Sequence, residues 1–332
     1  DLQACPKFQR LASLTLVKKK YRKQPRNTDL SAYRHPRWWL TWIALAFMWL
    51  LAQLPIRVQW WLGSGLGRLV WRVGGSRRRI TETNIRLCFP QLTKQQQAKL
   101  VKQTFIANGI GLLEVGAGWF CDSTKLKAIT TVHGLEHFEK ALEGGKGVLL
   151  IGAHYSTLEI SGGLTTKFIE ASAMQRDHNN PLINAVMTRA RERHFGAVHG
   201  ARDLRGLFRS LKQNHAVWYA TDQDYGRKDI VFAPFFGIPA GTITATSRIA
   251  ERSGCKLVPF SHFRRSGKPG YDIYFQPALE NFPSGDDLVD ATVINKTIEQ
   301  EIKRAPDQYL WMHRRFKTRP NPDDPGFYGR KR

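Results

Sequence analysis

The pattern of apolar and polar positions predicts a long domain in which strands and helices alternate. Short apolar runs that are typical of buried strands lie at residues 147–153, 216–220, 256–260 and 272–275. Stretches with the apolar spacing of helices separate most of them, at residues 94–117, 157–169, 181–195, 203–212, 242–253 and 287–305. This order predicts an α/β domain over residues 80–325, with a mostly parallel central sheet flanked by helices.

A second pattern precedes this domain, because residues 38–56 carry no charged side chain. As a helix they would be roughly 28 Å long, close to the hydrocarbon thickness of a bilayer. Tryptophans at both ends fit an interfacial aromatic belt, whereas Gln53 and Pro55 weaken a spanning interpretation. We therefore expect one transmembrane or membrane-anchor helix over residues 38–56, with a buried core helix as the alternative.

The residues next to this apolar segment are basic. Residues 57–79 combine an apolar helical stripe with Arg68 and Arg72, so we predict an interfacial basic amphipathic segment, although an ordinary surface helix would show the same pattern. Residues 1–37 form a basic N-terminal segment, and residues 326–332 form a basic tail.

Composition restricts the class of protein. The 332 residues include 51 Lys and Arg against 27 Asp and Glu, a formal net charge of +24, which indicates an anionic partner. A mean hydropathy of −0.38 excludes a polytopic membrane protein. The 42% hydrophobic content makes wholesale disorder improbable. The four widely spaced cysteines argue against a disulfide scaffold or a zinc ribbon.

The most informative chemistry follows the apolar run at residues 147–153. His154 comes directly after this predicted strand, and Glu159 lies five residues later. On one continuous helix the two side chains would point about 140° apart, so they meet only if His154 lies in the turn before the helix. We expect Glu159 to hydrogen-bond one ring nitrogen and leave the other free to accept a proton. The alternative is a histidine that merely caps or packs beside the helix.

No nucleophile pattern accompanies this pair. The sequence contains no G-x-S-x-G, so a serine hydrolase has little support. A histidine and a carboxylate without a Ser or Cys nucleophile suit direct attack by a substrate hydroxyl on an activated acyl group. His133 and His137 have no third ligand at a convincing spacing, so no metal site is expected.

The chain resembles the late acyltransferases of lipid A biosynthesis, within the lysophospholipid acyltransferase superfamily. The resemblance covers nearly everything from about residue 34 onward. It rests on the H-x4-E box at residues 154–159 and on the runs RDHNNPL at 176–182, WYATDQDYG at 218–226 and QYLWMHRRFKTRP at 308–320. The run at residues 78–90 resembles the family's segment after its membrane anchor.

The resemblance implies a function and a place in the cell. The family transfers a fatty acyl chain from acyl carrier protein to a hydroxyl of the Kdo-bearing lipid A precursor, at the cytoplasmic face of the inner membrane. It implies a glycerol-3-phosphate-acyltransferase-like fold with one N-terminal anchor helix, anionic inner-membrane lipids as partners, and His154 as general base beside Glu159. No bound cofactor or metal is expected, because the thioester of the co-substrate already activates the acyl group.

Further residues of these runs are candidates for the site. Attack on a thioester makes an oxyanion that needs a positive group, and Arg191 is slightly preferred over Arg193 for this role. Both arginines could equally lie on a solvated basic helix face. Arg176 and Asn180 follow a strand end where a phosphate or sugar would be contacted. The remaining candidates, which either hold arginines or contact sugar hydroxyls, are Asp222, Gln223 and Asp224.

Two other interpretations remain open at this point. One keeps the fold and changes the acceptor to a glycerophospholipid or another glycolipid. The other, from a different class, is a basic nucleic-acid-binding protein. The basic runs flank an apolar segment, and the sequence has no helix-turn-helix, RRM or zinc-finger pattern, so nucleic acid is the less favoured partner.

Overall fold

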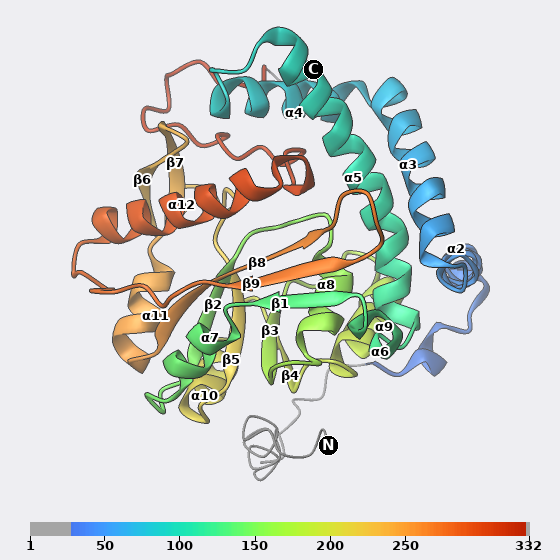
Figure 1. Ribbon diagram of the computed structural model, residues 1–332, viewed down its shortest axis with the longest axis horizontal. Coiled ribbons are helices and arrows are strands. Elements are labelled where there is room, and N and C mark those ends of the chain that lie inside the picture. The colour runs from blue at the N-terminus through green and yellow to red at the C-terminus, as the bar shows by residue number, and fades with distance from the viewer. Residues whose placement is uncertain (1–27, 330–332) are drawn as a thin grey trace, which may run out of the picture.

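Figure 1 shows a computed structural model of the chain, which describes residues 28–329. A seven-stranded sheet in the order β1-β9-β8-β2-β5-β3-β4 lies at its centre, and β6 and β7 form a separate antiparallel hairpin. The strands are β1 (Thr130–His133), β2 (Val148–Gly152), β3 (Ala171–Gln175), β4 (Ala197–Gly200), β5 (Ala216–Ala220), β6 (Ile230–Phe235), β7 (Ile238–Ile243), β8 (Lys256–Arg264) and β9 (Tyr271–Phe275).

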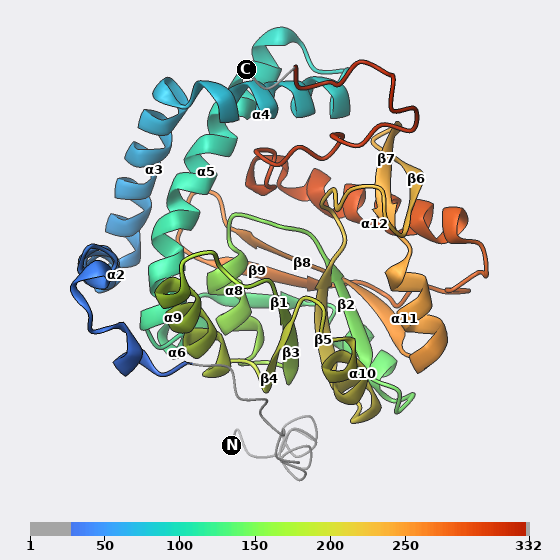
Figure 2. The same cartoon turned by 180° about the vertical axis from the view of Figure 1, so that it is seen from behind.

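Helices cover the sheet, and the helices that come first in the chain extend beyond it (Figures 1 and 2). They are α2 (Trp39–Ala52), α3 (Ile56–Val73), α4 (Gly75–Cys88), α5 (Lys94–Phe120), α6 (Thr124–Lys127), α7 (Leu135–Leu142), α8 (Leu158–Thr165), α9 (Pro181–Glu192), α10 (Leu204–Lys212), α11 (Ala245–Ser253) and α12 (Asp287–Arg304). Short 3-10 helices lie at Leu30–Tyr33, Pro36–Trp38 and Pro306–Gln308.

The predicted α/β architecture with a mostly parallel sheet is confirmed. Every strand pair of the seven-stranded sheet is parallel except β8 with β9. The central strand β2 is buried at all five positions, because β8 and β5 flank its edges and helices cover its faces. This explains why its sequence is an uninterrupted apolar run.

Helix α5 is the longest helix within residues 28–329 and lies between α3 and the sheet (Figures 1 and 2). Its first turn is closed by a capping box in which Thr93 and Gln96 satisfy each other's backbone N–H groups. Helix α3 packs against it at backbone distance, since a side chain at Gly63 would overlap the backbone of Ile110. Glycine therefore permits the close contact that joins the N-terminal helices to the domain.

The transmembrane or membrane-anchor helix predicted over residues 38–56 is not found as one continuous helix. The helix α2 begins at Trp39 and ends at Ala52, and α3 begins at Ile56 after Pro55. Proline lacks a backbone N–H group and clashes with the preceding turn, so the apolar segment is divided between two helices. Within residues 28–329, no helix combines the length and the apolar character that crossing a membrane requires.

The predicted bounds of the segments next to this apolar segment differ from the bounds of the helices in the structure. The amphipathic pattern expected over residues 57–79 belongs to α3, which ends at Val73, and a separate basic helix, α4, follows from Gly75. Most of the predicted basic segment 1–37, including its lysine-rich run, lies outside the described residues, as do residues 330–332 of the predicted tail.

Candidate active site

His154 and Asp222 meet at the carboxyl edge of the sheet. Strands β2 and β5 are parallel neighbours with Gly152 opposite Ala220, and each candidate residue follows its strand by two positions. The Nδ1 atom of His154 lies 2.7 Å from Oδ1 of Asp222, and the backbone N–H of His154 donates to Oδ2 at 2.9 Å. The carboxylate thus holds both the ring and the backbone of the histidine.

The environment of this pair shifts both pKa values. Burial disfavours the charged imidazole, but the charge and hydrogen bond of Asp222 outweigh burial and raise the pKa of His154. Burial likewise disfavours the carboxylate, yet His154 holds the pKa of Asp222 below its usual range. With Nδ1 donating to Asp222, the neutral ring carries its lone pair on Nε2, to which no group of residues 28–329 hydrogen-bonds.

The loop that carries His154 is fixed from two sides. The backbone N–H of Leu310 donates to the His154 carbonyl at 3.0 Å, and the N–H of Ser156 donates to the Gln308 carbonyl at 2.7 Å. On the other side α5 approaches so closely that a side chain at Gly111 would overlap the carbonyl oxygen of Ser156. The C-terminal segment and α5 together determine where the imidazole points.

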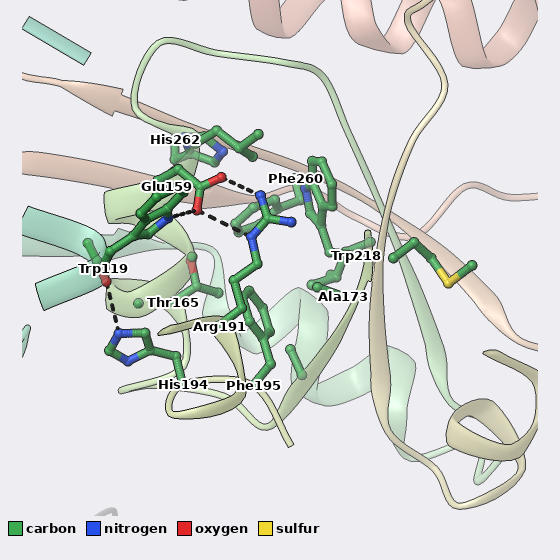
Figure 3. Close-up of a pocket in the computed structure, with 17 residues that line it drawn as sticks. Trp119, Glu159, Thr165, Ala173, Arg191, His194, Phe195, Trp218, Phe260 and His262 are labelled. Atoms are coloured by element: carbon green, nitrogen blue, oxygen red, sulfur yellow. Dashed lines mark hydrogen bonds and ion pairs between the residues drawn. The ribbon is translucent and has the colours of Figure 1, made fainter. Parts of the chain in front are cut away.

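Glu159 does not contact His154, which corrects the expected His154–Glu159 hydrogen bond. Glu159 lies in the first turn of α8 and forms an ion pair with Arg191 of α9, whose Nη2 and Nε atoms both donate to the carboxylate. The indole N–H of Trp119 donates to the same carboxylate at 2.9 Å (Figure 3). Asp222 is nearer because the sheet register places it beside His154, whereas α8 turns Glu159 toward α9.

Arg191 is a cation whose charge acts on His154. Its Nη1 atom donates to the side-chain oxygen of Gln175 at 3.1 Å, so three of its five N–H groups are already used. Its charge opposes protonation of His154 and so offsets part of the increase that Asp222 causes in the pKa of that ring. Arg191 is only 18% exposed, and a buried cation held by Glu159 is suited to stabilise developing negative charge.

A narrow apolar pocket of about 40 Å³ begins at the Glu159–Arg191 pair. Trp119 and Phe260 lie on its walls, and His194 and Phe195 lie at its other end (Figure 3). The ring of Trp218 lines the same pocket and makes an edge contact with His154, with centroids 6.0 Å apart. The remaining lining residues are Gly118, Leu150, Leu158, Gly162, Gly163, Thr165, Ala171, Ala173, Met174 and His262.

Two predicted binding residues are used within the fold. Asn180 caps α9, because its side-chain oxygen accepts from the N–H groups of Leu182 and Ile183, and its amide donates to Thr41 of α2. Arg193 follows α9 and donates to the backbone carbonyl of Trp119. Both contacts position helices around the pocket.

The other predicted residues, Arg176, Gln223 and Asp224, do not line the pocket. Arg176 is exposed just after β3, and Gln223 is half-buried next to Asp222. Asp224 holds the C-terminal segment instead of facing the pocket: it accepts from the N–H and the hydroxyl of Thr318 at 2.7 and 2.8 Å. Its own N–H donates to the ring of His313.

Sequence reasoning missed Trp119 and Gln175 as members of the site. Trp119 lies at the end of α5, forty positions before Glu159, and nothing in the local pattern distinguishes it from a core residue. Gln175 ends β3, whose end was expected before Arg176 although no apolar run predicted the strand itself. Asp222 was predicted as a candidate site residue. Its pairing with His154 could not be predicted, because it depends on which strands are neighbours in the sheet.

The described residues contain no group of three His, Cys, Asp or Glu side chains that could hold a metal ion. The expectation that the reaction needs no cofactor stays a prediction.

The fold and the site together place a histidine paired with a carboxylate at the carboxyl edge of a mostly parallel sheet, with an apolar pocket beside it. The model of the family described as bacterial lipid A biosynthesis acyltransferase matches residues 27–318. The chain belongs to this family, and it is therefore an O-acyltransferase.

Relatives in Escherichia coli K12 support this assignment. The chain is 38% identical over 289 residues to a lipid A biosynthesis palmitoleoyltransferase, covering 87% of this chain and 94% of the relative. It is also 38% identical over 291 residues to a lipid A biosynthesis lauroyltransferase, covering 87% and 95%. A lipid A biosynthesis myristoyltransferase is 26% identical over 290 residues, covering 87% and 90%.

Proposed function

We propose that this enzyme transfers a fatty acyl chain from the thioester of acyl carrier protein to a hydroxyl of the Kdo-bearing lipid A precursor. The observation that carries the proposal is the 2.7 Å contact between His154 and Asp222 beside an apolar pocket. A histidine oriented by a carboxylate is a general base, and an apolar pocket next to it suits an acyl chain.

Two transfers of one proton accompany the acyl transfer. Nε2 of neutral His154 takes the proton of the acceptor hydroxyl as its oxygen forms a bond to the thioester carbonyl carbon. The C–S bond then breaks, and the imidazolium returns the proton to the leaving sulfur, so the products are an ester and a free thiol. Asp222 stabilises the intermediate imidazolium and keeps the ring in the required tautomer.

We assign Glu159 a positioning role in place of direct contact with the base. The carboxylate of Glu159 binds Arg191, whereas the carboxylate of Asp222 binds His154. Arg191 retains two N–H groups that could point at the oxyanion of the tetrahedral intermediate. Trp119 and Gln175 restrict the rotation of this ion pair.

The donor's acyl chain would enter the pocket between Trp119, Phe195 and Phe260. At about 40 Å³ the pocket holds only two or three water molecules as it stands. A fatty acyl chain therefore enters only if the lining rings rotate, and the depth that they release limits the chain length that the enzyme accepts.

The acceptor is a membrane lipid, and the N-terminal helices offer a surface for the bilayer. Trp39, Leu40 and Phe47 of α2 are 60%, 78% and 61% exposed, and Trp61 of α3 is 73% exposed. Contiguous exposed apolar side chains of this size are typical of membrane contact sites. We propose attachment through α2 and α3 to anionic lipids at the cytoplasmic face of the inner membrane.

The test is acyl addition to the lipid precursor, measured by mass spectrometry. The variants are His154→Ala and Glu159→Ala, and Arg205→Ala on the exposed surface of α10 is the matched control. We expect the two site variants to lose at least about a hundredfold in rate and the control to keep wild-type turnover. Turnover near the wild-type rate in His154→Ala would refute the proposed chemistry.

A further inference from the structure

A second cleft, of about 920 Å³, lies between α4, the first turns of α5 and the C-terminal segment. Four cations surround it: Arg79 and Arg86 of α4, Lys94 of α5 and Arg314 of the C-terminal segment. Its floor includes Ile80, Val101, Phe327 and Tyr328. The notable feature of this cleft is the concentration of positive charge on three separate elements.

This charge is not balanced within the protein. None of the four cations forms an ion pair within residues 28–329, and the acid that lines the cleft, Glu82, is bound to Arg78 at 2.8 Å. Like charges around one cleft repel each other, and an anionic partner relieves that repulsion and is drawn to the cleft.

The cleft suits a water-soluble partner better than a bilayer. None of the residues that line the cleft is an exposed large hydrophobic side chain, and the nearest one in the sequence is Val73 at the end of α3, which is 73% exposed. The exposed tryptophans and phenylalanine of the molecule lie on α2 and α3 instead. A surface that contacts lipid would carry such side chains, so the partner of this cleft is an acidic soluble molecule.

The cleft is joined to the active site by a short stretch of chain. Asn84 of α4 donates to the carbonyls of Trp311 and His313, both at 2.7 Å. Leu310, at the start of the same stretch, donates to the carbonyl of His154. Because Arg314 is four residues from Leu310, its Cα atom is at most about 14 Å from that of Leu310.

We propose that this cleft docks the acidic surface of the carrier protein that presents the acyl thioester to His154. The inference rests on the proposed function, because it names where the donor of that same reaction binds. The carrier's acidic face would lie against Arg79, Arg86, Lys94 and Arg314. Its flexible thioester arm would then follow the C-terminal segment toward the imidazole.

The experiment compares two donors that carry the same acyl group, a carrier-protein thioester and a coenzyme A thioester. The variant is Arg79→Glu with Arg86→Glu, both exposed on α4, and the control is Arg205→Glu on α10, at the opposite end of the molecule (Figures 1 and 2). We expect kcat/KM for the carrier thioester to fall at least about tenfold through a higher KM. We expect the coenzyme A reaction and the control to be unchanged.

Salt gives an independent readout. The wild-type kcat/KM for the carrier thioester should fall as ionic strength rises, and the double variant should lose most of that dependence. A thermal melt that matches the wild type shows that the exposed substitutions leave the fold intact. Lys94→Glu, on the opposite wall of the cleft, should reproduce the selective loss at smaller size.

Three outcomes would overturn the docking role: unchanged use of the carrier thioester by the variants, an equal loss with both donors, or a raised KM for the lipid acceptor. A wild-type enzyme that used only the coenzyme A thioester would refute the proposed donor and the docking role together. Wild-type use of the carrier thioester with unaltered variants would refute the docking role alone.

Discussion

His154 and Asp222, 68 positions apart in the chain, occupy equivalent places after two neighbouring parallel strands. Their 2.7 Å contact makes Asp222 the carboxylate that orients the imidazole. Asp222→Asn keeps the size of the side chain but removes the charge that stabilises the imidazolium. We expect kcat to fall by about 10²–10⁴, with the acyl product measured by mass spectrometry. A loss no greater than that of an exposed Asp→Asn variant, such as Asp323→Asn, would contradict this assignment.

The pH dependence of the reaction should report the same pair. His154 must be neutral to accept a proton, and its pKa is raised by Asp222. We therefore expect kcat/KM to rise with pH along an acid limb whose apparent pKa lies above 6.5. In Asp222→Asn the residual activity should have its acid limb at lower pH, because the group that raises the pKa is gone. An unmoved limb would assign the titration to another group.

The contribution of protonated His154 to folding stability changes with pH in the opposite direction to kcat/KM. Because the folded pKa of His154 is above its unfolded value, its contribution to stability is complete at pH values below the unfolded pKa. That contribution is lost as the pH rises through the folded pKa. His154→Gln should therefore lower the Tm more near pH 5.5 than near pH 8.5, measured by thermal melts. An equal decrease at both pH values would show that the charge of His154 does not stabilise the fold.

The Glu159–Arg191 pair can be tested by a double-mutant cycle. Removing either partner leaves a largely buried charge without its counter-ion, so Glu159→Gln and Arg191→Gln should each cost about 2–4 kcal/mol of unfolding free energy. The double variant should lose less than the sum, with a coupling of about 1–3 kcal/mol in urea unfolding. Additive losses would mean that the two side chains do not stabilise each other, and Glu159 would again be a candidate partner of His154.

The sequence predicted strand β2 of this site but not the apolar run of strand β3. The strand at residues 148–152 is recognisable because it is buried on both faces and hence wholly apolar. Strand β3 was missed because Ser172 and Gln175 interrupt its apolar character, and both are buried with side-chain partners on other elements. The His154–Asp222 contact depends on β5 lying beside β2, which is decided by packing between distant segments. Spacing along the chain predicted Glu159 as the partner of His154, because such spacing does not show which distant segments pack together.

The depth of the apolar pocket should be adjustable at Gly162 of α8. A Cβ atom at this position would lie 3.1 and 3.3 Å from atoms of the Phe195 ring at the end of the pocket, so Gly162→Ala pushes that ring or shortens the cavity. We expect the preferred acyl chain to shorten by about one or two carbons. Each methylene that no longer fits in the pocket loses about 0.8 kcal/mol of burial, which lowers kcat/KM for the longer thioesters. The measurement is the ratio of kcat/KM values for thioesters of several lengths. The control is Gly65→Ala, where an added Cβ meets no atom within 4 Å, and an identical profile in both variants would reject this location of the acyl chain.

A buried carboxylate on α5 joins α3 to strands β8 and β9 of the sheet. Glu114 accepts from Arg264 of β8, from the hydroxyl of Tyr271 at 2.7 Å and from the indole of Trp60 of α3 at 3.0 Å. Its side chain is completely buried, and that of Arg264 is 6% exposed.

Glu114→Gln should therefore leave a buried guanidinium without its counter-ion and cost about 3–5 kcal/mol of unfolding free energy. Glu82→Gln removes the partner of Arg78 in an exposed pair and should change stability by less than about 1 kcal/mol. Urea unfolding of the two variants in one detergent compares the effects directly. Because Glu114 contacts neither His154 nor Asp222, turnover of Glu114→Gln at low temperature should stay near the wild-type rate. Equal, small losses in both variants would show that the buried network does not hold α3, α5 and the sheet together.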